Sequence, residues 1–98
     1  MVYKPDRLAP NASRMRLVTL EKRFGKLKCM VVGCGYDKVL EVHRHVPGRS
    51  GGLYEIGNMF TVCPNHHAEV TRGITTLVKL SDDALEIIES EQLLQIAV

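Results

Sequence analysis

The spacing of apolar positions changes along the chain and predicts the order of its elements. Between about residues 14 and 24, apolar side chains recur at helical intervals. Residues 39–46, VLEVHRHV, alternate between apolar and polar side chains, and residues 59–62, MFTV, form a second short apolar run. These patterns predict a helix followed by two strands, with the glycine-rich stretch 47–58 as the loop between the strands.

Prolines and a serine mark further boundaries of the predicted elements. Pro5 and Pro10 indicate an extended stretch before the first helix. Pro64 opens a predicted helix over residues 64–72, because proline is favoured in the first helical turn. Residues 74–80 fit either a strand or a loop. Ser81, followed by two aspartates, predicts the start of a C-terminal helix, since serine caps helices and acids favour their positive end.

Length and composition indicate one small folded domain. The 98 residues bury only a modest core, and 45% hydrophobic with 24% charged residues argues against a disordered chain. No apolar run approaches the roughly 20 residues that cross a bilayer, and the N-terminus lacks the apolar core of a signal peptide. We therefore expect a cytoplasmic α+β domain without a membrane partner. Its parts are a basic arm and helix (1–28), a core (29–73) and an acidic helical segment (74–98).

Charge is distributed unevenly between the two ends of the chain. Residues 1–28 carry eight basic and two acidic side chains, whereas residues 80–98 carry five acidic and no basic ones. A basic arm suits a polyanion such as DNA, although a solvated basic face has the same composition. The candidate nucleic-acid-binding residues are Arg14, Arg16, Lys22, Arg23, Lys26, Lys28 and Arg49.

Three cysteines and a histidine have the spacing of a zinc site. Cys29 and Cys34 enclose four residues, and Cys63 stands three residues before His66. In a reducing compartment such spacing favours metal over disulfide. Four ligands with no open position predict a structural Zn²⁺ that stabilises a small core. Two alternatives stay open: His67 in place of His66, and a Cys29–Cys34 disulfide with a buried Cys63.

The other histidines suggest a second site. His43 and His45 share one face of the predicted strand, because strand side chains alternate. His67 opens the helix that would lie across this strand. Few protein ligands, with water and phosphate completing the shell, suit a hard cation in phosphodiester hydrolysis. The pattern therefore favours a catalytic divalent cation near these histidines.

Residues 29–73 resemble the HNH endonuclease family, which has the ββα-metal (His-Me finger) fold. The resemblance rests on CMVVGC, LEVHRHVPGRSGG and IGNMFTVCPNHHAEVTRG. It implies that His43 and His67 hold the catalytic cation (Mg²⁺, Mn²⁺, Ni²⁺ or Zn²⁺) and that Asn58 pins the interstrand loop by backbone hydrogen bonds. Some members carry a further metal-binding histidine where this chain has Thr71. The general base of the family falls on Arg44, which cannot accept a proton.

Three interpretations of the catalytic residues follow from Arg44. His43 is the base and His67 holds the cation with water; or His45 is the base after a local shift of the strand; or the site is degenerate and Arg44 binds phosphate. The resemblance implies a DNA endonuclease, in a bacterial or phage setting, that nicks one strand.

Two alternatives to a nuclease stay open. A zinc-stapled module could bind nucleic acid without cutting it. A structural protein could pack the histidines and dock a partner through its acidic tail. In either case segment 81–98 could cover the core or form a homodimer interface.

Overall fold

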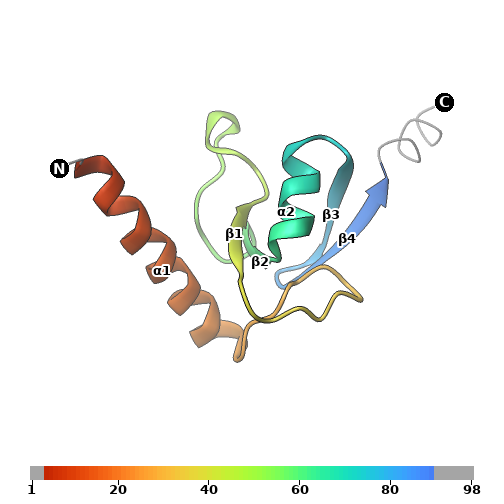
Figure 1. Ribbon diagram of the computed structural model, residues 1–98, viewed down its shortest axis with the longest axis horizontal. Helices are drawn as coiled ribbons and strands as arrows, with labels where there is room; N and C mark the ends of the chain where they lie inside the picture. Colours follow the sequence, from red (N-terminus) through yellow and green to blue (C-terminus); the bar gives the residue numbers. More distant parts are fainter. Residues whose placement is uncertain (1–3, 90–98) are drawn as a thin grey trace.

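The computed structural model describes residues 4–89, and side chains from residue 13 to residue 88, as two helices and two short antiparallel sheets (Figure 1). The elements in chain order are α1 (Lys4–Phe24), β1 (Glu41–Arg44), the 3₁₀ turn η1 (Gly48–Ser50), β2 (Met59–Val62), α2 (Pro64–Thr71), β3 (Thr75–Ser81) and β4 (Ala84–Glu89). The predicted α+β class is confirmed by this content.

Helix α1 begins earlier than the sequence pattern predicts. It starts at Lys4, so the stretch across Pro5 and Pro10 is helical rather than extended. Pro5 lies in the first turn, where a backbone N–H has no helical partner to lose, whereas Pro10 gives up one hydrogen bond. The helix ends at Phe24, and the next residue, Gly25, closes the last turn with a φ of 85° and an N–H bond to the Glu21 carbonyl (2.8 Å). No helix among the described residues is long and apolar enough to cross a membrane.

Strands β1 and β2 form the sheet that carries most of the predicted site. Glu41 pairs with Val62 and His43 pairs with Phe60 in this antiparallel register. Every residue of β2 is buried, whereas β1 is partly exposed. Helix α2 follows β2 after one residue and contacts β1, and α1 contacts β1 from the side away from α2 (Figure 1).

The cysteine segment 29–32 joins the two sheets by backbone hydrogen bonds. The Met30 N–H donates to the Thr61 carbonyl of β2 (2.8 Å), and the Met30 carbonyl accepts from the Leu85 N–H of β4 (2.9 Å). Val32 donates to the Leu85 carbonyl (2.8 Å). The core therefore lies around this segment, and its larger buried side chains are Leu20, Met30, Val31, Met59, Phe60, Val62, Leu77 and Leu85.

Residues 81–88 do not form the predicted helix but belong to the β3–β4 hairpin. Ser81 ends β3, and its hydroxyl donates to the Asp83 carboxylate (2.9 Å) and accepts from the Asp83 N–H (3.4 Å). A serine that can cap a helix supports a turn equally well, because both uses bond an N–H two residues ahead. Residues 90–98, the rest of the predicted C-terminal segment and its dimer interface, lie outside the described residues.

Candidate functional site

Cys29, Cys34, Cys63 and His66 form one cluster, the Cys3His group, beside the start of α2. One ligand atom from each residue lies within 4.8 Å of the other three. The Nδ1 atom of His66 is 3.5 Å from the Cys29 sulfur and 3.3 Å from the Cys63 sulfur. Ligands about 2.0–2.3 Å from a tetrahedral Zn²⁺ have comparable mutual separations. The predicted grouping is confirmed, and it is compatible with a structural zinc.

Local backbone chemistry positions the four ligands. Cys63 is the N-cap of α2, and its sulfur accepts a hydrogen bond from the His66 N–H (3.4 Å). The other two cysteines lie on a turn in which the Cys34 N–H bonds the Val31 carbonyl (3.1 Å). Gly33 has a φ of 87°, in the left-handed region that glycine adopts at low cost. The turn and the helix start thus supply one ligand pair each.

The three thiols are free, and burial affects the ionisation of Cys29. Cys29 and Cys63 are buried, and none of the three cysteines is in a disulfide. Burial, with a smaller contribution from Cys34, raises the pKa of the Cys29 thiol to about 11. Because a metal binds the thiolate, metal uptake must release this proton.

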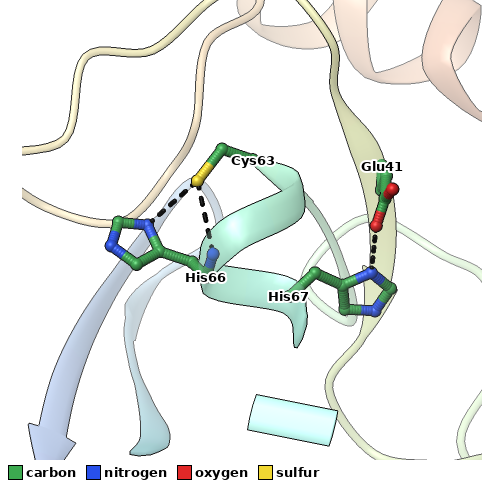
Figure 2. Close-up of polar contacts among 4 residues, drawn as sticks. All are labelled: Glu41, Cys63, His66 and His67. Atoms are coloured by element: carbon green, nitrogen blue, oxygen red, sulfur yellow. Dashed lines mark hydrogen bonds and ion pairs between the residues drawn. The ribbon is translucent and has the colours of Figure 1, made fainter. Parts of the chain in front are cut away.

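The consecutive histidines of α2 point to different sites (Figure 2). His66 faces the Cys63 sulfur, whereas the Nδ1 atom of His67 lies 2.6 Å from the Glu41 Oε1 atom on β1. Successive helical residues project about 100° apart, so one helix start can serve both sites. His66, and not His67, is therefore the histidine that lies with the three cysteines.

His43, His45 and His67 gather with Glu41 in a second group, the histidine cluster. The His43 ring lies between the other two, with centroids 5.7 Å from His45 and 5.9 Å from His67. The Nε2 atom of His43 and the Nδ1 atom of His45 are buried without a hydrogen-bond partner. Buried polar atoms are seldom left unpaired, so these two nitrogens are candidate atoms for binding an ion.

Burial also keeps two of these rings uncharged. It lowers the pKa of His43 to about 4, with smaller contributions from the charges of His45 and His67. Burial likewise lowers the pKa of His45, and the charge of Lys79 adds to this effect. Neutral imidazole is the form that binds a metal or accepts a proton.

Glu41 belongs to this cluster and the charge of Lys79 acts on it, although the sequence pattern predicted neither residue. Glu41 shares the face of β1 with His43, so strand alternation carried a signal for it. Lys79 comes from β3, and its Nζ atom is 3.4 Å from the Asp82 carboxylate at the hairpin turn. Its approach to His45 depends on a hairpin that the sequence pattern did not predict.

Arg44 lies on the opposite face of β1 from His43, because neighbouring strand residues alternate. Its guanidinium carbon is 4.4 Å from the centroid of the Tyr54 ring. The guanidinium carbon of Arg16, on α1, is 3.4 Å from the same centroid. A Cβ at Gly48 would come within 2.9 Å of an Arg44 guanidinium nitrogen, so glycine makes room for this side chain.

Asn58 ties together the two ends of the loop between β1 and β2. Its Oδ1 atom accepts from the Val46 N–H (2.7 Å), and its Nδ2 atom donates to the carbonyls of Val46 (3.1 Å) and Leu53 (2.8 Å). The His45 N–H in turn donates to the Asn58 carbonyl (2.9 Å). These are hydrogen bonds of the kind that the HNH resemblance implies for Asn58, and they hold His45 beside His43.

We expect Asn58→Ala to lower the free energy of unfolding by about 2 kcal/mol, because it removes three part-buried side-chain hydrogen bonds to the backbone of Val46 and Leu53. Urea denaturation followed by circular dichroism measures the change. Asn65→Ala, at an exposed position in the first turn of α2, is the matched control and should change stability by no more than about 0.5 kcal/mol. Equal losses in the two variants would contradict the role of Asn58.

The other predicted nucleic-acid-binding residues do not converge on the histidine cluster. They are exposed on α1, on the segment after it and on η1, namely Arg14, Lys22, Arg23, Lys26, Lys28 and Arg49. Lys26 is 3.7 Å from the Asp37 carboxylate, and the Arg23 guanidinium lies 5.0 Å from the Phe24 ring centroid. Arg16 differs from these residues, because it shares the Tyr54 ring with a second cation, Arg44.

No family model, curated protein or solved structure matches this chain. The function is therefore inferred from the Cys3His group and the histidine cluster. Among the described residues, the Cys3His group is the only one in which three or more cysteine, histidine or carboxylate ligand atoms come this close. A cation at the histidine cluster would take most of its shell from water and phosphate.

Proposed function

We propose that this chain is a metal-dependent DNA endonuclease of the HNH type. The observation that carries the proposal is the histidine cluster, with its two buried and unpartnered ring nitrogens. The order β1, β2, α2, with cysteines before β1 and at the start of α2, is the order that the HNH resemblance implies. We also propose that the Cys3His group holds a structural Zn²⁺, which would position His67 through its neighbour His66.

His43 and His67 suit a catalytic divalent cation. The unpartnered Nε2 atom of His43 is a free ligand atom. The Glu41 carboxylate, 2.6 Å from the Nδ1 atom of His67, accepts a hydrogen bond from the Nδ1–H group, which leaves the Nε2 lone pair for an ion. When bound, Mg²⁺, Mn²⁺, Ni²⁺ or Zn²⁺ would supply Lewis-acid stabilisation of the phosphate charge.

We assign the general-base role to His45. Its lowered pKa keeps the ring unprotonated and able to accept a proton, and its Nδ1 atom has no protein partner. His43 is the alternative, but a pKa of about 4 makes it a weaker base. A water oxygen bonds to the scissile phosphorus while one of its protons passes to His45. The bond to the 3′ oxygen breaks with its electron pair on that oxygen, which takes a proton from a second water, so the products are a 3′-hydroxyl and a 5′-phosphate.

Cleavage of supercoiled plasmid tests the proposal. The purified protein is incubated with Mg²⁺, Mn²⁺ or Ni²⁺, and EDTA serves as the control. We expect metal-dependent conversion to the open circular form, because one active site cuts one strand. Folded, zinc-loaded protein that cuts with none of these cations would refute the nuclease.

Arg44 favours a second candidate function, a module that binds nucleic acid without cutting it. It stands where the HNH resemblance puts the base, and it stays protonated. Such a module would bind DNA with a steep dependence on salt, since phosphate contacts release counterions, and would show no cleavage.

We expect Glu41→Gln to lower the cleavage rate and the affinity for Mn²⁺ by about 10- to 100-fold, since glutamine keeps the size but loses the charge that orients His67. Initial rates and isothermal titration calorimetry measure the two effects. Glu86→Gln, at an exposed position of β4, is the matched control. Wild-type Mn²⁺ affinity together with a wild-type rate in Glu41→Gln would contradict this role.

A further inference from the structure

Arg16 of α1, Arg44 of β1 and Tyr54 of the interstrand loop form a cationic group outside the histidine cluster, the arginine–tyrosine group. The two guanidinium carbons lie 3.4 and 4.4 Å from the centroid of the same ring. The three residues come from separate segments, so the fold rather than local sequence brings the two charges together. Tyr54 keeps 39% of its surface exposed, which leaves the group accessible.

The positive charge of this group has no acidic partner among the described side chains. The ion pairs described there join Lys26 to Asp37, His67 to Glu41 and Lys79 to Asp82, and none includes either arginine. Two guanidinium groups over one ring repel each other, and the ring face offsets only part of that repulsion. A bound anion that both arginines contact would offset the rest.

The geometry suits a phosphate in particular. The guanidinium group presents a planar fork of donors that matches phosphate oxygens. The Tyr54 ring packs against the Arg44 fork, and Gly48 leaves space for it, since a Cβ at Gly48 would lie 2.9 Å from a guanidinium nitrogen. Both arginine side chains are half-buried, so they lose less freedom on binding than fully exposed ones.

We propose that the arginine–tyrosine group binds one backbone phosphate of the DNA, which Arg16 and Arg44 contact together. The identity of this ligand rests on the proposed function. Because Arg44 and His43 lie on opposite faces of β1, the phosphate held here is a different one from the phosphate attacked at the histidine cluster. Arg44, which stands where the HNH resemblance puts the general base, would thus position the substrate.

Anisotropy of a fluorescein-labelled DNA duplex, measured in EDTA over a range of salt concentrations, tests the site. Arg16→Gln and Arg44→Gln should each weaken binding but change the slope of log K against log salt by less than one, because the shared phosphate keeps one arginine. The double variant should reduce the slope by about one, because the phosphate then has neither arginine. Tyr54→Leu should weaken binding, and Tyr54→Phe should not. Arg72→Gln, at the C-cap of α2, is the matched control.

Arg16→Lys and Arg44→Lys keep the test valid if a glutamine variant fails to fold. They retain the charge but lose the fork, so we expect weaker binding with an unchanged slope. Wild-type affinity and slope in the arginine variants, or a slope loss of about two in the double variant, would overturn the shared phosphate site. If the wild-type protein cleaves plasmid but the double arginine variant keeps the wild-type salt slope, the phosphate site is wrong and the nuclease stands. Slope loss without cleavage would support the site and reject the nuclease.

Discussion

His67→Ala is expected to reduce plasmid nicking by about 1,000-fold or more, while the zinc content and the fold stay unchanged. The substitution removes one of the two proposed protein ligands of the catalytic cation and leaves Glu41 without its partner. The Cys3His group is spared, because His66 and His67 project to different sides of α2 (Figure 2). Initial rates of open-circle formation with saturating Mg²⁺ or Mn²⁺ measure the effect.

Asn65→Ala is the matched control for this experiment, since it changes an exposed residue of the same helical turn. We expect it to nick plasmid at the wild-type rate. Bound zinc and the thermal transition are measured for both variants, so that unfolding is distinguished from loss of chemistry. A His67→Ala variant that retains cleavage with normal metal dependence would refute the assignment of His67.

Local signals were sufficient for the parts of the fold that surround the candidate sites. The apolar run 59–62 is β2, and Pro64 after Cys63 marks the start of α2. The grouping of Cys63 with His66 was predictable because their spacing spans one helical turn from an N-cap. Each of these features depends on residues close together in sequence, where propensity and spacing are informative.

Features that depend on distant pairing were not predictable. Ser81, Asp82 and Asp83 are compatible with a helix start or a turn, and the backbone bonds of Leu85 to Met30 and Val32 favour the strand. The same limitation explains why Lys79 beside His45 was missed. The contact of Arg16 with the Tyr54 ring was not predictable for the same reason, because α1 and the interstrand loop meet only in the folded chain.

The two sites are coupled through the start of α2. Cys63 caps the helix, His66 completes the Cys3His group, and His67 reaches Glu41 on β1. A zinc bound by the first two residues would set the direction of the third. The proposed structural metal and the geometry of the histidine cluster are therefore not independent, and loss of the zinc site should affect both stability and the proposed cleavage.

Cys63→Ser is accordingly expected to abolish both zinc binding and the cooperative thermal transition. Zinc binding to such sites contributes about 10–16 kcal/mol at neutral pH, which is comparable to or larger than the total stability of about 5–15 kcal/mol of a typical domain. The small core of this chain cannot compensate for that loss. Circular dichroism follows unfolding, and a colorimetric assay after denaturation measures bound zinc.

Two variants of His66 separate zinc binding from other effects of substitution near the N-cap. His66→Ala should behave like Cys63→Ser, because it also leaves three ligands. His66→Cys restores four ligands as an all-cysteine site, which zinc accepts equally well, and should retain both the metal and the thermal transition. An unchanged transition and unchanged zinc content in Cys63→Ser would show that the Cys3His group does not hold a structural metal.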